Sequence, residues 1–397
     1  MAQNPVLPLL FQPLSLRDLT LKNRVVIAPM MQHAAPNGLA TSWHLVHLGK
    51  FALGGAGLVL TESTAVSPVG RIGKDDLGLW ADEHVDALLP IVEFVHANGA
   101  AIGVQLGHAG RKAGSMPLWD GGGMPLDPAI MAKVDPNWRR IGPSAIAAAP
   151  GWSVPDAMDE VAINRVVEEF RAAASRADRA GFDVVELHFG HGYLVASFLS
   201  PVSNQRQDAY GGNREGRMRL ALQIVVAVRE VWPSTKPLFC RVSSVDGALG
   251  GWSLEDTVAL AIEFKRFGVD VVDCSSGGLS DQGAALPVAR GLGFQVPFAH
   301  QVRQESGVLT QAVGMIVNAQ QAEDILRDGS ADLIAVGREV LYDPYWALHA
   351  QADLCPDATF RDWPLPHGVW LAKRHPTLQE ALAEGGKSQL NGSTSIS

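Results

Sequence analysis

Eight short apolar runs, rich in β-branched residues, alternate along the chain with longer segments whose apolar residues recur every three or four positions. This alternation is typical of a parallel sheet whose strands are joined by helices. The runs are residues 24–28, 58–61, 101–106, 184–188, 238–242, 269–274, 311–316 and 333–336. An α/β fold with eight such units is expected to close into a single (β/α)8 TIM barrel, because a doubly wound sheet rarely uses so many.

The helical segments between the runs are marked by their ends as well as by their periodicity. Residues 160–180 carry apolar side chains at helical spacing and stop at Gly181, a residue suited to a helix C-terminus. Residues 214–231 follow the same pattern and stop before Pro233. Both helices precede a predicted strand, as the barrel requires.

Three segments fall outside this rhythm. Residues 14–23 predict a small N-terminal hairpin that plugs the N-terminal mouth of the barrel. Residues 113–150 form a long insertion after the third strand, and because a loop of that length is usually functional, we expect a lid. We therefore predict one barrel domain over residues 1–375, with a C-terminal extension, and a flexible tail rich in Gly, Ser, Thr and Asn over residues 385–397.

The composition fits a globular protein that handles small molecules. The 397 residues are 47% hydrophobic, enough for a large core, and the formal net charge is −9. Surfaces that bind nucleic acid or anionic membranes concentrate Lys and Arg, so neither partner is expected. The N-terminal apolar stretch lacks a basic flank and no apolar run reaches the length of a membrane span, so we expect neither a signal peptide nor a span. Three cysteines without metal-ligand spacing favour a cytoplasmic location.

The candidate site residues follow the runs, because a (β/α)8 barrel builds its site at the carboxyl ends of its strands. Gly314 and Gly337, at the last two runs, permit close approach of a ligand to the backbone, and Arg338 adds a planar cation. Loops at these places commonly bind phosphate. A phosphorylated cofactor fits, although glycines that merely end strands would give the same pattern.

Two polar residues inside apolar runs suit the rest of such a cofactor. Arg241 is costly to bury unless an anion or an electron-rich group pairs with it, and a salt bridge to a core carboxylate would also serve. The side chain of Gln105 is either a satisfied core amide or a match for the donor and acceptor edge of a flavin ring. A flavin accounts for both residues.

The loop after the fourth run carries His188, His191 and Tyr193. Two histidines three residues apart are also a partial zinc signature, but no third ligand and no HExxH glutamate accompany them, so no metal is expected. Imidazoles that donate hydrogen bonds to a substrate oxygen, with a phenol as proton donor, are the better chemical interpretation.

This loop lies in a long motif that reads ELHFGHGYL at 186–194, FLSP at 198–201 and YGG at 210–212, with Asn204, Arg206 and Asp208 between the last two stretches. The motif resembles that of the Old Yellow Enzyme family of ene-reductases, nearest to its bacterial thermophilic-like branch and the xenobiotic reductases. The segments QLGHAGRK at 105–112 and VGR at 336–338 also match. The resemblance covers roughly residues 9–375.

The resemblance implies non-covalent FMN as the cofactor and NAD(P)H as the reductant, with activated C=C bonds such as those of enones reduced in a ping-pong cycle. It places at the isoalloxazine ring Pro29, Met30, Ser63, Gln105 and Arg241, and at the phosphate Gly314, Gly337 and Arg338. It makes His188 and His191 the groups that bind the electron-withdrawing group of the substrate, and Tyr193 the proton donor to Cα.

Two departures from the family pattern bear on the reaction and on substrate binding. Met31 stands where the branch has a cysteine that tunes the flavin, and His33 stands where it has a tyrosine that touches substrate. A thioether neither donates a hydrogen bond nor ionises. Oxidative chemistry on amines or acyl thioesters, which relatives on the same barrel perform, and flavin binding without turnover therefore stay open as alternatives.

Trp370, well beyond the eighth run, is either a packing residue on its own barrel or part of an interface. In the branch that the sequence resembles, this segment reaches the neighbouring subunit, which implies that Trp370 lines the substrate pocket of a partner. Symmetric dimers are the commonest oligomers, and Trp is enriched at interface centres. We expect a homodimer or a dimer of dimers.

Overall fold

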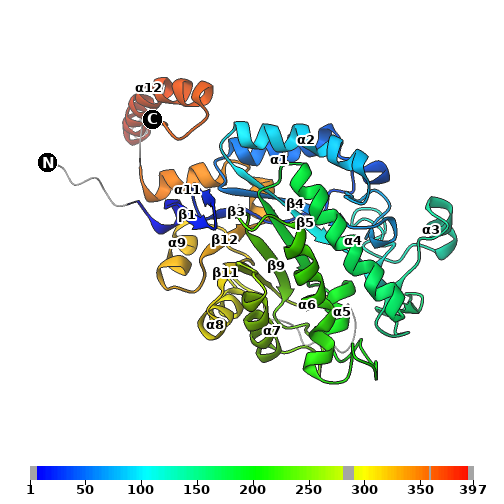
Figure 1. Cartoon of the computed structure of the whole chain (residues 1–397). Coiled ribbons are helices and arrows are strands. Elements are labelled where there is room, and N and C mark those ends of the chain that lie inside the picture. The colour runs from blue at the N-terminus through cyan, green and yellow to red at the C-terminus, as the bar shows by residue number, and fades with distance from the viewer. Residues whose placement is uncertain (1–6, 280–289, 357–358, 392–397) are drawn as a thin grey trace, which may run out of the picture.

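A closed barrel of eight parallel strands forms the centre of the molecule (Figure 1) and confirms the predicted fold. The computed structural model describes residues 7–279, 290–356 and 359–391. Around the barrel the strand order is β10-β11-β12-β3-β4-β5-β8-β9. The strands are β3 (Val25–Ile27), β4 (Leu58–Ala65), β5 (Ala101–Gly107), β8 (Val184–Phe189), β9 (Leu238–Ser243), β10 (Val271–Ser275), β11 (Leu309–Ala312) and β12 (Leu333–Val336).

Helices connect successive barrel strands and cover the outside of the barrel (Figure 1). The covering helices are α1 (Ser42–Leu53), α2 (Asp82–Ala97), α4 (Glu160–Arg179), α6 (Arg214–Val231), α7 (Leu254–Arg266), α8 (Val296–Ser306), α9 (Ala319–Arg327) and α11 (Trp346–Leu354). Helix α4 illustrates the local causes: Asp159 accepts a hydrogen bond from the N–H of Ala162 and so caps the first turn. Ile163, Val166 and Phe170 are buried on one face. The predicted helices at 160–180 and 214–231 are thus confirmed as α4 and α6.

Several shorter elements complete the chain. Short α-helices are α3 (Pro128–Val134), α5 (Leu194–Leu199) and α10 (Arg338–Tyr342). Single 3-10 turns are η1 (Leu9–Phe11), η2 (Pro36–Gly38), η3 (Pro68–Gly70) and η4 (Gly110–Lys112).

The seventh predicted strand is displaced in the structure. The sequence pattern predicts a strand over 311–316, but β11 covers Leu309–Ala312. Gly314 has a φ of 114° and Met315 a φ of 51°, and neither value belongs to extended backbone, so the strand ends before them. Gly314 therefore lies in a loop at the carboxyl end of the barrel.

An antiparallel hairpin, β1 (Leu14–Leu16) and β2 (Leu19–Leu21), confirms the predicted plug. Its Leu16 and Leu21 pack into the barrel interior against apolar residues near the starts of the strands. Arg17 ties the hairpin to the barrel, because its Nε lies 2.8 Å from Oδ2 of Asp270.

The barrel interior changes from apolar to polar along its axis. Side chains two residues apart on a strand point to the same face. Val184, Phe239, Val271 and Leu309 pack in the apolar interior. The residues two positions further along these strands are Glu186, Arg241, Asp273 and Gln311, all buried. These four residues and Gln105, which donates a hydrogen bond to Glu186, are the five residues that we call the polar layer.

The insertion at 113–150 folds back on the barrel. It contains α3 and the strand β6 (Ile141–Gly142), which pairs with β7 (Asp156–Ala157). Met131 and Trp138 from the insertion belong to an apolar cluster that Met31 and Tyr193 contact from its edge. Its role as a lid stays a prediction, and the cluster places it next to candidate substrate residues.

The C-terminal extension is the long helix α12 (Leu365–Asn391), which projects away from the barrel (Figure 1). Residues 385–391, expected to belong to a flexible tail, continue this helix, since the Gly pair there is surrounded by good helix formers such as Ala, Glu, Lys and Gln. Residues 392–397 lie outside the described residues. Within the described ranges, no helix is both long and apolar enough to cross a membrane.

Candidate active site

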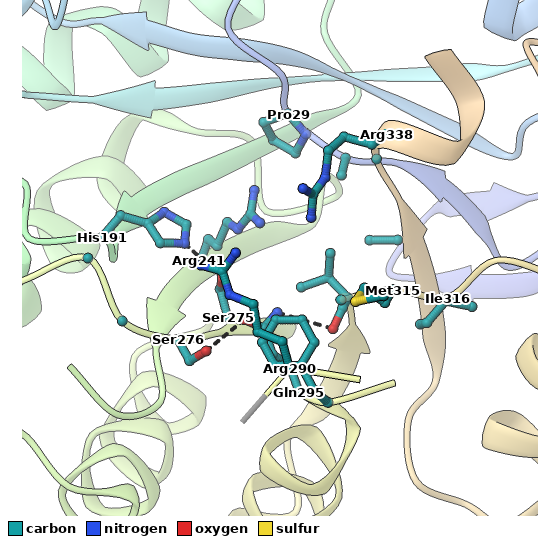
Figure 2. Close-up of a pocket in the computed structure, with 18 of the residues that line it drawn as sticks. Pro29, His191, Arg241, Ser275, Ser276, Arg290, Gln295, Met315, Ile316 and Arg338 are labelled. Atoms are coloured by element: carbon teal, nitrogen blue, oxygen red, sulfur yellow. Dashed lines mark hydrogen bonds between the residues drawn. The ribbon is translucent and has the colours of Figure 1, made fainter. Parts of the chain in front are cut away.

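A cavity of about 1180 Å³ opens at the carboxyl ends of the barrel strands (Figure 2). Six of the eight predicted cofactor residues line it: Pro29, Met30, Arg241, Gly314, Gly337 and Arg338. His191 lines it as well. The barrel therefore gathers residues that are more than 300 positions apart in the chain, such as Pro29 and Arg338, around one space.

One part of the cavity suits an anion. A Cβ atom on Gly314 would lie 3.0 Å from Nε2 of Gln295 and from Cε1 of Phe294, so the close approach and the positive φ both favour glycine. Arg338, at the start of α10, and Arg290 reach the cavity (Figure 2), and neither forms an ion pair with another described residue. Guanidinium groups beside a glycine loop are suitable partners for a phosphate.

Arg290 and Gln295 are among the lining residues that the sequence did not predict, and Gln295 lies close to Ser276, which follows β10. The Ser276 hydroxyl donates to Oε1 of Gln295 at 2.7 Å, and Nε2 of Gln295 donates to the carbonyl of Val313 at 3.1 Å. No motif or periodicity marks Arg290 and Gln295, because Gln295 reaches the cavity only through its hydrogen bonds to Ser276 and Val313.

The sequence left two interpretations of Arg241 open, an ion pair with a core carboxylate and a contact with a cofactor, and the structure is compatible with both. Its Nε lies 3.2 Å from Oδ2 of Asp273, so it has a core carboxylate partner, and its side chain also borders the cavity. Burial raises the pKa of Asp273, and the charge of Arg241 opposes that rise.

Gln105 and Ser63 do not line the cavity. Nε2 of Gln105 donates to Oε1 of Glu186 at 2.8 Å, so the amide is a satisfied core group, the alternative that its sequence allowed. Ser63 on β4 lies opposite Gln105 on β5. Gln105 therefore belongs to the polar layer of the barrel interior, and Ser63 lies beside it on the neighbouring strand.

His188, His191 and Tyr193 are brought together as predicted. Nδ1 of His191 lies 3.2 Å from Nε2 of His188, and Nε2 of His191 lies 2.7 Å from the Ser275 hydroxyl. The ring of Tyr193 meets the ring of His188 edge-on, with centroids 5.2 Å apart. Loss of solvation, with Arg241 and Lys112 nearby, lowers the pKa of His191 to about 3, and burial also lowers the pKa of His188. Both imidazoles are therefore neutral at physiological pH, so each carries a single N–H, and one of these two N–H groups donates in the contact between the rings.

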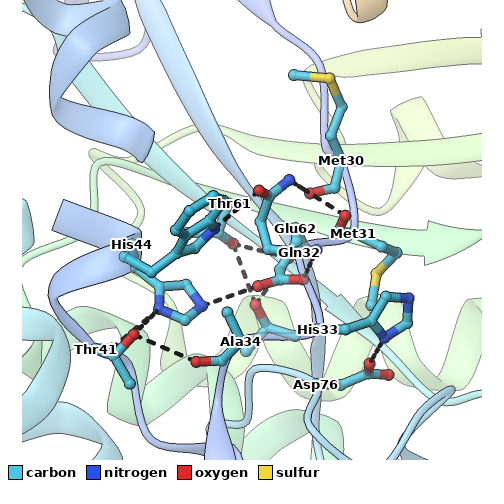
Figure 3. A network of polar contacts seen from close by, with 12 residues as sticks. Met30, Met31, Gln32, His33, Ala34, Thr41, His44, Thr61, Glu62 and Asp76 are labelled. Carbon is cyan, nitrogen blue, oxygen red and sulfur yellow. Dashed lines mark hydrogen bonds and ion pairs between the residues drawn. The ribbon is translucent and has the colours of Figure 1, made fainter. Parts of the chain in front are cut away.

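A buried carboxylate fixes the segment that carries Met30 and Met31 (Figure 3). Oε2 of Glu62 accepts from the N–H of Gln32 at 2.5 Å, and Oε1 accepts from Nε2 of His44 at 3.0 Å. Nδ1 of His44 accepts from the N–H of Thr41, which identifies Nε2 as the protonated nitrogen. Neither Glu62 nor His44 was predicted as a site residue, because a register shift between Leu60 and Ser63 alters which face the residues of β4 occupy.

Met31 and His33 lie on this same segment. Nδ1 of His33 lies 2.8 Å from Oδ1 of Asp76, and its ring meets Trp119 of the insertion edge-on at 5.5 Å. The hydrogen bond and charge of Asp76 outweigh burial and raise the pKa of His33. His33 has a φ of 49°, so the backbone here is held in a left-handed conformation that non-glycine residues seldom adopt.

Trp370 lies apart from the cavity of its own chain. It sits on α12 with 70% of its surface exposed, and Nζ of Lys373 lies 5.1 Å from its ring centroid. Among the described residues, no three His, Cys, Asp or Glu side chains form a cluster that could hold a metal.

Comparisons of the whole chain with known proteins show which proteins it is similar to. A sequence profile described as the NADH:flavin oxidoreductase / NADH oxidase family matches residues 9–356. The chain is 45% identical over 347 residues to an NADPH dehydrogenase of Listeria monocytogenes serotype 4b (strain CLIP80459), an alignment that covers 87% of this chain and 95% of that protein. An NADPH dehydrogenase of Geobacillus sp. (strain WCH70) is 41% identical over 350 residues, covering 87% and 94%. The solved structure of morphinone reductase superposes with a TM-score of 0.71 at 29% identity, covering 87% of this chain and 90% of that chain.

The hydrogen bonds that Glu62 accepts from Gln32 and His44 predict a large loss of stability when its carboxylate is removed. In Glu62→Ala, the N–H of Gln32 and Nε2 of His44 lose a buried acceptor, so the free energy of unfolding should fall by about 2–4 kcal/mol. Urea unfolding measures this change. Glu83→Gln, at an exposed position of α2, is the matched control and should change stability by less than about 0.5 kcal/mol. Equal stability of the two variants would show that the hydrogen bonds of Glu62 contribute little to the free energy of unfolding.

Proposed function

The chain belongs to the NADH:flavin oxidoreductase / NADH oxidase family, the Old Yellow Enzyme family, and is an NAD(P)H-dependent FMN oxidoreductase; from this membership we propose that it reduces activated C=C bonds, such as those of enones, in a ping-pong cycle. The observation that supports this reaction is that His191 lines the cavity, which Arg241 and Arg338 also border, and that His188 contacts both His191 and Tyr193. A group that binds a carbonyl oxygen and a group that delivers a proton then act on the same substrate.

The proposed cofactor contacts divide between the two parts of the cavity. Gly314, Gly337 and Arg338 would hold the phosphate of non-covalent FMN, with Arg290 as an additional cation. The isoalloxazine ring would lie against Pro29, Met30 and Arg241. Ser63 and Gln105, which do not line the cavity, would support the strands beside it. Bound FMN supplies a group that takes a hydride from NAD(P)H and passes it to the substrate.

The remaining chemistry belongs to the side chains of the protein. His188 and His191, both neutral, would donate hydrogen bonds to the substrate oxygen, where negative charge develops as Cβ is reduced. The Tyr193 hydroxyl would deliver a proton to Cα. Met31 and His33 would contact substrate from the segment that Glu62 fixes, and Trp119 of the insertion would cover it from the side.

We also propose a homodimer, or a dimer of dimers, in which Trp370 lines the cavity of the partner. A Trp ring that is 70% exposed on a helix projecting from its own barrel supports this arrangement, because large aromatic side chains are enriched at interface centres. The cysteines of the described chain are free thiols, which fits a reducing compartment, so we propose a cytoplasmic location.

The Tyr193→Phe variant tests the reaction most directly. Removing the phenol proton should slow the oxidation of the reduced enzyme by cyclohexenone by about 10²-fold, while reduction by NADPH stays nearly unchanged. Stopped-flow absorbance separates these two half-reactions. Tyr342→Phe, at an exposed position, is the control and should leave both rates as in the wild type. An unchanged enone step in Tyr193→Phe would exclude Tyr193 as the acid, and turnover of N-methylated amines instead of cyclohexenone would replace reduction by the oxidative alternative.

The Trp370→Ala variant tests the shared pocket. It should raise KM for several enones, or change their ranking, and leave bound FMN unaffected, because Trp370 would contact substrate rather than cofactor. Leu382→Ala, on the same helix and 61% exposed, is the matched control. A monomer by light scattering at assay concentration, or identical kinetics of both variants, would rule out the proposed dimer contact.

A further inference from the structure

The polar layer contains two carboxyl groups and one cation in a place without solvent. Glu186 and Asp273 both have no exposed surface. Arg241 is the cation that acts on both, and its ion pair is with Asp273. If both carboxyl groups were ionised, one negative charge in the barrel interior would have no counter-charge within the layer, which is an unfavourable state.

The hydrogen bonds of Glu186 lead to the same conclusion independently. Gln105 donates to its Oε1, but no described residue donates to its buried Oε2. The buried oxygens of Asp273 also have no hydrogen-bond donor among the described residues, but Oδ2 of Asp273 lies 3.2 Å from Nε of Arg241, whereas Glu186 has no ion-pair partner there. An ionised carboxylate only accepts hydrogen bonds, so a buried oxygen without a donor is poorly satisfied. A neutral carboxylic acid carries its own proton on that oxygen and no longer needs a donor.

The groups that face Glu186 from the adjoining strands are consistent with this state. Burial and the negative charge of Asp273 raise the pKa of Glu186 to about 8, while Arg241 and Gln105 oppose the rise. The Cys240 thiol on β9 is also nearby, and burial raises its pKa, so it adds no charge near neutral pH. His188, two residues further along the same strand, has a lowered pKa and is neutral.

We propose that Glu186 is a neutral carboxylic acid that positions the amide of Gln105 and leaves Arg241 and Asp273 as the only charged pair of the polar layer, so that the layer carries no net charge beneath the cofactor cavity. As far as it concerns the flavin, this inference rests on the proposed function. Hydride transfer from NAD(P)H brings two electrons and one proton into the site and leaves NAD(P)+, so the site gains one negative charge. A neutral layer favours that gain over a layer that already carries a negative charge.

The first test detects the neutral acid in the protein without cofactor. The infrared spectrum near neutral pH should contain the C=O stretching band of a protonated carboxyl group that is missing in Glu186→Gln and retained in the exposed control Glu83→Gln. Because Asp273 raises the pKa of Glu186, the band should disappear at a lower pH in Asp273→Asn than in the wild type. Should Asp273→Asn fail to fold, the comparison of wild type with Glu186→Gln is sufficient.

The second test follows the flavin midpoint potential of the holoenzyme against pH. Wild type and Glu186→Gln should have the same potential near neutral pH, since an amide resembles the neutral acid, and the wild-type potential should fall below that of the variant above about pH 8, where Glu186 ionises. A higher potential for Glu186→Gln already at neutral pH, or no infrared band that depends on Glu186, would overturn the proposal. A protein that binds flavin but does not reduce enones would fail the proposed function and still pass both tests.

Discussion

Burial of a small set of charged and amide side chains inside a closed barrel is the constraint on which the rest of this structure depends. Because side chains two apart on a strand share a face, the strands that contribute Val184, Phe239 and Val271 to the apolar interior must next contribute Glu186, Arg241 and Asp273. Within the layer, Arg241 pairs with Asp273, and Gln105 donates a hydrogen bond to Glu186. Arg241 also borders the cavity, so the polar layer adjoins it.

The sequence predicts the barrel and much of the site because both are encoded locally. Runs of β-branched residues mark the strands. His188, His191 and Tyr193, the three candidate functional groups, lie close together in the sequence, so their proximity needs no long-range information. Gly314, Gly337 and Arg338 are recognisable because a barrel of this kind brings the ends of its last two strands together. The end of β11 was predicted at the wrong residue, because the positive φ of Met315, which lies beyond the strand, cannot be inferred from its side chain.

What the sequence does not predict depends on pairings between distant elements. Glu62 reaches His44 and Gln32 because the register of β4 shifts after Leu60. The alternation of apolar residues along the sequence does not predict such a shift. Asp273 occupies an apolar run, where its ion pair with Arg241 is visible only once β9 and β10 lie side by side. Trp370 belongs to the same class, because its proposed role depends on a second chain.

We propose that the cavity at the carboxyl ends of the strands holds FMN by its phosphate at Gly314, Gly337 and Arg338. The most direct measurement compares the dissociation constants of FMN and riboflavin for the protein freed of cofactor, in the wild type and in Arg338→Ala. FMN should bind the wild type on the order of 10²-fold more tightly than riboflavin, because charged hydrogen bonds to the phosphate are strong, and most of that difference should be lost in Arg338→Ala. Equal affinity of the wild type for FMN and riboflavin would show that the protein does not bind the phosphate of FMN at this place.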